Sequence, residues 1–329
     1  MPVVYLIIFL YDKYFFIIKC CRSRKINVIL RNKRCYDRSA GKPTDSFMEV
    51  VSMAYYDFTE YKDVLFVGDI HGEFNPLVWD AVTRKGVKDA LIVVCGDIGM
   101  GFYKPTYYRD TFRSMDRRLK ERNIALAMFR GNHDDPSYFK GAAKESLSVF
   151  DTIHLIEDYS VLGTSIGDVL CIGGARSIDR TSRTLDVSWW FGENVQPMPD
   201  GFLDELAKDG RSIRVVCSHA APSLALPNDG DISPDSQLYL WGLRDETLLE
   251  DNRNEREYLT KALQDLKDAG QPVEYWIYGH YHECFYKEHD GVKFIGLDML
   301  RTYPLRKGET VRVYSDWFSP GDENENIIN

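Results

Sequence analysis

Short apolar runs alternate with amphipathic stretches from about Tyr61 onward, and this alternation is the main structural signal in the chain. A bounded apolar run is typical of a buried strand, whereas apolar residues spaced three or four apart indicate a helix. The predicted strands are Val64–Val67, Ala90–Cys95, Ile124–Phe129, Ser160–Leu162, Val169–Ile172, Ile213–Cys217, Glu274–Tyr278, Val292–Leu297 and Thr310–Trp317. The predicted helices are Pro76–Lys85, Tyr107–Asn123, Phe202–Lys208 and Glu255–Ala269. This rhythm predicts an α/β fold in which helices cover a sheet.

Charge divides the chain into a basic start and an acidic body. Residues 1–47 contain ten Lys and Arg against three Asp and Glu, a net charge of +7. The whole chain has 41 basic and 50 acidic residues, so residues 48–329 hold 31 against 47, a net charge of -16. We expect a basic extension at 1–47, disordered or outside the core, a single domain at 48–318 and an acidic tail at 319–329. An acidic domain binds long nucleic acids poorly, because their phosphates need cationic partners.

The N-terminal extension also contains an apolar run, Val3–Leu10, which Asp12 and Lys13 interrupt. A membrane span needs about 20 apolar residues, so we expect no membrane association, with an N-terminal anchor as the alternative. The seven cysteines include no C-x-x-C pair, and Cys95, Cys171 and Cys217 each lie at or near the end of an apolar run. These are predicted to be buried strand thiols in a reducing, cytoplasmic compartment.

Residues of types that can bind metals follow five of the predicted strands. They are Asp69 and His71, Asp97, Asn132 and His133, His219, and His280 and His282. Five of the seven histidines in the chain are in this set. Carboxylate, amide and imidazole groups together suit divalent transition metals, and α/β proteins bind ligands at the carboxyl ends of their strands. The pattern therefore predicts a metal centre.

The ordered motifs resemble those of the calcineurin-like metallophosphoesterases over about residues 62–300. The matching motifs are Asp69-x-His71, Gly96-Asp97, Gly131-Asn132-His133-Asp134, His219 and Gly279-His280-x-His282. The resemblance implies a four-layered α/β/β/α sandwich with mixed sheets and two divalent metal ions. It assigns the first metal to Asp69, His71 and His282. It assigns the second to Asn132, His219 and His280, with Asp97 bridging both.

The implied reaction is hydrolysis of a phosphomonoester or phosphodiester, by in-line attack of a hydroxide that bridges the two metals. His133 would face the phosphate and the leaving group as a catalytic residue. A nearby carboxylate, Asp69 or Asp134, could hold it protonated as a general acid. Mn²⁺ is the expected metal, with Fe or Zn²⁺ as alternatives. The expected substrates are a phosphorylated small molecule, a nucleotide or a phosphoprotein.

One departure from the family concerns phosphate binding. In protein Ser/Thr phosphatases the Gly-Asp motif continues to an Asp-Arg that grips phosphate, but here Asp97 is followed by Ile-Gly-Met-Gly. Arg176 and Arg180 are the candidate replacements, with a plain surface role as the alternative. They lie in Gly-Gly-Ala-Arg-Ser-Ile-Asp-Arg, which, with Trp189 and Trp190, resembles phage and bacterial members of the superfamily. The two tryptophans could stack on an aromatic leaving group or pack in the core.

Two other functions fit the same fold. One is a catalytically silent scaffold that binds other proteins, and the other is a nuclease that acts on short nucleic acids. A scaffold of this kind usually loses metal ligands, whereas here every expected ligand and His133 are present. The sequence therefore favours a metal-dependent phosphoric ester hydrolase.

Overall fold

The computed structural model describes residues 9–10, 14–15, 53–226 and 236–306. The chain divides into two units, Met1–Val50 and Val51–Asn329. In the first unit, β1 (Phe9–Leu10) pairs antiparallel with β2 (Tyr14–Phe15). The predicted strand at 310–317 and the acidic tail at 319–329 lie outside the described residues, as does the rest of 1–47. No helix within the described ranges is both long and apolar enough to span a bilayer.

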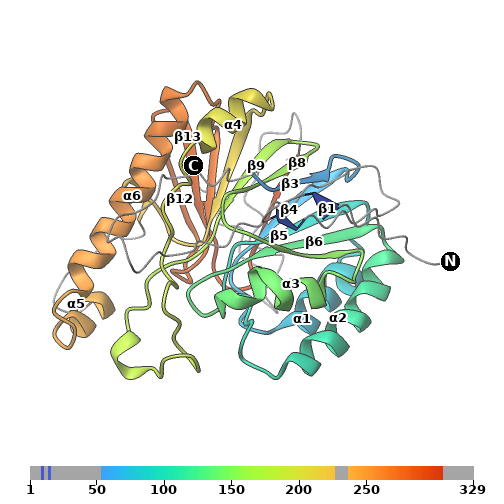
Figure 1. The fold of residues 1–329 in the computed structure, drawn as a ribbon, viewed down its shortest axis with the longest axis horizontal. Coiled ribbons are helices and arrows are strands. Elements are labelled where there is room, and N and C mark those ends of the chain that lie inside the picture. Colours follow the sequence, from blue (N-terminus) through green and yellow to red (C-terminus); the bar gives the residue numbers. More distant parts are fainter. Residues whose placement is uncertain (1–8, 11–13, 16–52, 227–235, 307–329) are drawn as a thin grey trace. The chain divides into compact units, whose positions relative to one another are not determined.

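The second unit is built on two sheets (Figure 1). Across the five-stranded sheet, the order is β14 (Thr302–Leu305), β4 (Asp63–Val67), β5 (Ala90–Val94), β6 (Ile124–Phe129) and β7 (Ile153–Ile156). Strands β4 to β7 run parallel, and β14 is antiparallel to β4. The carboxyl ends of β4, β5 and β6 therefore meet at one edge of this sheet.

The second sheet has seven strands and is also mixed. Its order is β12 (Phe285–His289), β13 (Val292–Gly296), β11 (Tyr275–Tyr278), β10 (Ile213–Ser218), β9 (Gly167–Ile172), β8 (Ser160–Thr164) and β3 (Tyr55–Phe58). Strands β9, β10, β11 and β13 run parallel, while β8 and β12 pair antiparallel with their neighbours β9 and β13. The carboxyl ends of β9, β10 and β11 consequently lie side by side.

The helical elements come mainly from the connections between strands. They are α1 (Phe74–Val78), the π-helix η1 (Trp79–Arg84), α2 (Pro105–Lys120), η2 (Pro136–Phe139), α3 (Gly141–Leu147), η3 (Arg180–Ser182), α4 (Phe202–Lys208), η4 (Ser223–Ala225), α5 (Gln237–Gly242) and α6 (Leu248–Asp268). Proline at the start of α2 suits that position, because the first helical N–H needs no partner within the helix. In Figure 1, α1, α2 and α3 lie against the five-stranded sheet, and α4 and α6 lie against the other.

Alternate residues of each strand point to opposite faces, and this divides the core into three layers. Between the sheets, Phe66 and Val93 pack in the same cluster as Val215 and Ile277. On the outer face of the five-stranded sheet, the alternate strand residues pack against α1 and α2. On the outer face of the seven-stranded sheet, the corresponding residues pack against α4 and α6. The central strands β4, β5 and β6 are buried on both faces, which explains why they are almost continuously apolar in sequence. The predicted α/β/β/α sandwich with mixed sheets is confirmed.

The differences from the predicted elements are local. The helix predicted at Pro76–Lys85 is an α-helix only to Val78 and continues as the wider π-helix η1. Helix α6 begins at Leu248, seven residues before the predicted start at Glu255. Its first turns are mostly polar, so they lack the apolar spacing that indicates a helix. Cys95, Cys171 and Cys217 are buried free thiols, as predicted.

Candidate metal centre

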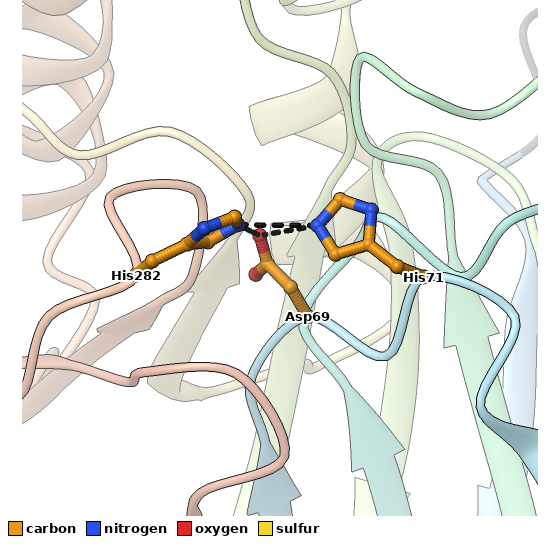
Figure 2. Close-up of side chains that lie close together, drawn as sticks. All are labelled: Asp69, His71 and His282. Carbon is orange, nitrogen blue, oxygen red and sulfur yellow. Dashed lines mark hydrogen bonds and ion pairs between the residues drawn. The ribbon is translucent and has the colours of Figure 1, made fainter.

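The loops after β4 and β11 bring together the first group of side chains that could hold a metal ion (Figure 2). Asp69 is buried, and its Oδ2 lies 3.0 Å from Nε2 of His282. His71 Nε2 lies 3.1 Å from His282 Nε2 and 3.8 Å from Asp69 Oδ2. The backbone N–H of His280 donates to Asp69 Oδ1 at 2.9 Å, which holds the two loops together.

Asp97 lies between this group and a second one. Its carboxylate is buried, and the backbone N–H of His133 donates to its Oδ1 at 2.8 Å. Nε2 of His219 lies 3.3 Å from the same oxygen. The other oxygen, Oδ2, faces His71 and His133, whose Nε2 atoms lie 3.8 and 3.9 Å away. The two oxygens of one carboxylate thus face nitrogen atoms of residues that follow different strands.

His219 and Asn132 form the second group, with His280 beside them. Nδ1 of His219 lies 2.8 Å from the carbonyl oxygen of Cys95, which can only accept, so Nδ1 carries the proton. In the neutral ring, the Nε2 lone pair then faces Asn132 Oδ1 at 3.1 Å and Asp97 Oδ1 at 3.3 Å. The His280 ring packs edge-on against His219, with centroids 5.0 Å apart.

These contacts test whether the centre suits a cation. Nε2 of His219 faces two oxygen atoms that have no proton to offer, so a positive charge is needed between them, either a proton on the imidazole or a metal ion bound by the neutral ring. His71, His282 and Asp69 converge in the same way. The donor set therefore fits divalent metal ions, and carboxylate, amide and imidazole groups are ligands that such ions accept.

The backbone is strained at four of these residues. His71, Asp97, His280 and His282 have φ angles of 41°, 46°, 71° and 50°, in the left-handed region that residues other than glycine rarely adopt. Such conformations cost about 1–3 kcal/mol each and persist where the surroundings enforce them. At Gly96 a side chain would collide with the ring of His219, so only glycine allows Asp97 and His219 to approach each other.

The environment shifts the pKa values of the histidines in different directions. Burial alone would lower the pKa of His219, but the carboxylates of Asp97 and Asp69 raise it to about 10. Burial and the neighbouring His219 hold the pKa of His280 well below its ordinary value. Burial likewise lowers the pKa of His133. One cluster therefore contains imidazoles of opposite proton affinity.

His133 lies between Asp97 and an arginine that the sequence analysis did not select. Arg183 places Nη1 at 2.7 Å from Nδ1 of His133 and Nη2 at 3.0 Å from Nε2. Arg183 lies just beyond η3, in the connection between β9 and α4. No periodic pattern marks this residue, and the one available signal was that it closes the Arg-rich segment that begins at Arg176.

The structure places Arg176 and Arg180 in a different network. Arg180 pairs with Asp245 at 2.6 Å and with Asp251 at 2.8 Å. The backbone N–H of Arg176 donates to buried Glu255, and its guanidinium lies 3.9 Å from Asp251. These contacts tie the Arg-rich segment to α6 and to the turn before it. None of the described contacts of either arginine is with a residue of the metal centre.

Asp134 does not contact His133 as the sequence suggested. Its two oxygens accept four backbone N–H groups at 2.7–3.0 Å, those of Ile98, Gly99, Met100 and Gly131. Burial and the nearby Asp97 raise its pKa to about 6, while the backbone donors act in the opposite direction. Within the described residues, none of its hydrogen bonds reaches the ring of His133, so Asp134 ties the loop after β5 to the loop after β6.

Sequence reasoning also missed the residues that orient Asn132. Its Nδ2 donates to Ser177 Oγ at 2.9 Å, and Ser177 Oγ donates to Glu193 at 2.6 Å. All three side chains are buried. This chain of hydrogen bonds fixes which end of the amide faces inward, so that Oδ1 is directed at His219. Trp190 is also buried, in line with a packing role.

Comparison with known proteins identifies a family for this chain. The model of the calcineurin-like phosphoesterase family matches residues 62–284, which is 223 of the 329 residues. No characterised protein matches significantly by sequence. Similar solved structures include a Thermus thermophilus protein, TT1561, with 13% identity, a TM-score of 0.40 and coverage of 73% of this chain and 90% of that one. The phosphopantetheinyl hydrolase of Mycobacterium tuberculosis has 15% identity, a TM-score of 0.39 and coverage of 74% and 91%.

A cold-active protein-tyrosine phosphatase of a psychrophilic Shewanella has 14% identity, a TM-score of 0.32 and coverage of 92% of this chain and 94% of that one. Because these TM-scores are low, the assignment rests on the family model. That model spans about two thirds of the sequence and covers every candidate metal ligand described above. The chain belongs to the calcineurin-like phosphoesterase family.

Proposed function

We propose that this chain is a phosphoric ester hydrolase that uses two divalent metal ions, with Mn²⁺ as the expected metal. The observation that carries the proposal is the position of Asp97. One of its oxygens faces His219 and the other faces His71, two histidines that come from opposite sheets. A carboxylate in this position can be shared by two cations, and two-metal sites are typical of phosphatases and nucleases.

The ligands divide into two sets around Asp97. Asp69, His71 and His282 would hold one ion. Asn132, His219 and His280 would hold the other. When bound, the two ions would activate a water molecule and offset the negative charge of the phosphate. The amide of Asn132 contributes an oxygen without a charge, which keeps the centre attractive to an anion.

The chain itself would supply orientation and a proton donor. His133 faces the centre next to Asp97, so its imidazole N–H can donate to the oxygen of the leaving group. In the absence of a contact with Asp134, the His133 backbone is oriented by its hydrogen bond to Asp97. Ser177 keeps the Asn132 oxygen directed inward. We infer that the substrate is a phosphorylated small molecule, a nucleotide or a phosphoprotein.

Metal analysis of the full-length protein, paired with hydrolysis assays, tests the proposal. We expect about two Mn²⁺ ions per chain and chelator-sensitive hydrolysis of p-nitrophenyl phosphate or bis-p-nitrophenyl phosphate. The preferred ester will separate a phosphomonoesterase from a phosphodiesterase. Asp97→Ala is expected to lose metal and to reduce hydrolysis by at least about 100-fold, because it removes the shared ligand.

The matched control is Asp110→Ala. Asp110 is exposed on α2, where it pairs with Arg113. This control should retain the metal content and the activity of the wild type. Full metal occupancy and full activity in Asp97→Ala would show that the assignment of the centre is wrong. Two bound metals with no hydrolysis of either ester would favour the scaffold alternative.

A further inference from the structure

Arg183 brings a positive charge next to His133, at the edge of the metal centre. Its guanidinium lies 2.7 Å from Nδ1 and 3.0 Å from Nε2 of His133, and the Nε2 atom lies 3.9 Å from the shared carboxylate of Asp97. The Arg183 side chain is 15% exposed. It is therefore largely enclosed at the edge of the centre rather than extended into solvent.

His133 cannot accept a hydrogen bond from both Nη atoms of this guanidinium. A neutral imidazole has one nitrogen that accepts a hydrogen bond, while the other carries a proton, and a protonated imidazole has no acceptor. At most one of the two short contacts between Arg183 and His133 is therefore a hydrogen bond. At least one of the two Nη atoms therefore faces a ring nitrogen that cannot accept its hydrogen bond, and such an arrangement favours a nearby anion.

The orientation of the fork is fixed from behind. Nε of Arg183 donates to Asp179 Oδ1 at 2.6 Å, and Nη1 also lies 3.2 Å from the carbonyl oxygen of Ser188. These partners hold the back of the guanidinium, so its outer donors face His133. Arg176 and Arg180 differ from Arg183 because their guanidinium groups face acidic residues of α6 and of the turn before it, whereas that of Arg183 also faces His133.

We propose that Arg183 is a substrate-binding residue that donates hydrogen bonds to the phosphoryl oxygens of the ester, and that Asp179 is its positioning residue. The inference rests on the proposed function. A planar guanidinium fork matches the spacing of phosphate oxygens and forms charge-assisted hydrogen bonds with them. Arg183 would bind the phosphate in place of the Asp-Arg that follows the Gly-Asp motif in protein Ser/Thr phosphatases and is absent from this chain.

Calorimetric titration of inorganic phosphate into the Mn²⁺-loaded full-length protein measures this binding without relying on turnover. We expect Arg183→Gln to bind phosphate about 10- to 100-fold more weakly, because a charge-assisted hydrogen bond is lost. Arg183→Lys should be intermediate, since an ammonium keeps the charge but not the fork. The Mn²⁺ content of both variants and their melting temperatures should match the wild type. Arg113→Gln, on the surface of α2, is the matched control.

Asp179 is tested with a conservative pair. Asp179→Asn should weaken phosphate binding and raise KM more than it lowers kcat, because the fork loses its charged support. Asp179→Glu should restore part of the phosphate affinity. A role in local stability alone would change the melting temperature of both variants and leave phosphate affinity in the folded protein unchanged.

The outcomes separate this inference from the proposed function. If the protein hydrolyses esters but Arg183→Gln binds phosphate as tightly as the wild type, the inference is overturned and the proposed function stands. If the protein hydrolyses no ester but binds phosphate through Arg183, the inference stands and the proposed function fails. Loss of Mn²⁺ from Arg183→Gln, or no phosphate binding by the wild type, would also overturn the inference.

Discussion

Replacing Asp134 with asparagine is expected to destabilise the protein by about 2–6 kcal/mol. Each carboxylate oxygen of Asp134 accepts two backbone N–H groups, Gly99 and Met100 on Oδ1, and Ile98 and Gly131 on Oδ2. An asparagine has only one oxygen, so its NH₂ group must face two of these four donors. A buried donor left without an acceptor costs about 1–3 kcal/mol, and the substitution creates two.

Thermal unfolding measures this cost. A change of 1 kcal/mol shifts the melting temperature by about 2–4 °C for a domain of 150–250 residues, so we expect a fall of at least about 4 °C. The neighbouring residue provides the control. Asp135 accepts the N–H of Ser137 at 2.9 Å as the cap of η2, a role that asparagine fulfils equally well. Asp135→Asn should therefore melt close to the wild type.

The same pair of variants distinguishes two roles for Asp134. If its carboxylate acted on His133, Asp134→Asn would lose turnover while keeping the stability of Asp135→Asn. That result would refute the structural role. Loss of stability, together with near-normal turnover in the folded fraction at low temperature, would support it.

Two further substitutions test the surroundings of the centre. Ser177→Ala removes the acceptor that orients the Asn132 amide, and we expect Mn²⁺ affinity to fall about 10- to 100-fold in a dye-competition titration. An unchanged affinity would show that the amide needs no support. Burial raises the pKa of Glu255 to about 7, so the folded state binds this proton more tightly than the unfolded state does. Relative to Glu255→Gln, the wild type should lose roughly 3 kcal/mol of unfolding free energy between pH 4.5 and 7. Urea unfolding of both proteins at each pH measures this, and a stability difference between them that does not change with pH would contradict the prediction.

The elements buried on both faces were predictable from sequence. Strands β4, β5 and β6 are continuous apolar runs because each is covered by helices on one side and by the other sheet on the other. The amphipathic helix α2 was equally clear, since Phe112 and Met115 point to the core and its charged residues, apart from Asp116, are not buried. In both cases the order of apolar and polar residues within a single element shows which of its faces are buried.

Other elements carry no such signal. Strand β12 lies at the edge of its sheet, and most of its residues are half-buried or exposed. Strand β3 likewise lies at an edge and has only one buried residue. Strand β14 contains a proline, which normally argues against a strand, but it pairs only with β4 at the edge of the sheet, where a missing N–H is tolerated. These strands exist because of their neighbours, which no local pattern can show.

In the metal centre, too, some features could be predicted from the sequence and others depend on contacts between distant segments. Its candidate metal ligands follow strands whose carboxyl ends meet, so their convergence could be inferred from topology alone. The roles of Asp134 and Arg183 depend instead on loop paths. Asp134 is adjacent to His133 in sequence, yet its carboxylate turns back to four backbone amides. Arg183 is fifty residues from His133, yet it contacts the ring. Within loops, sequence distance is therefore a poor guide to which side chains interact, and the contacts around this centre depend on the folded loop paths.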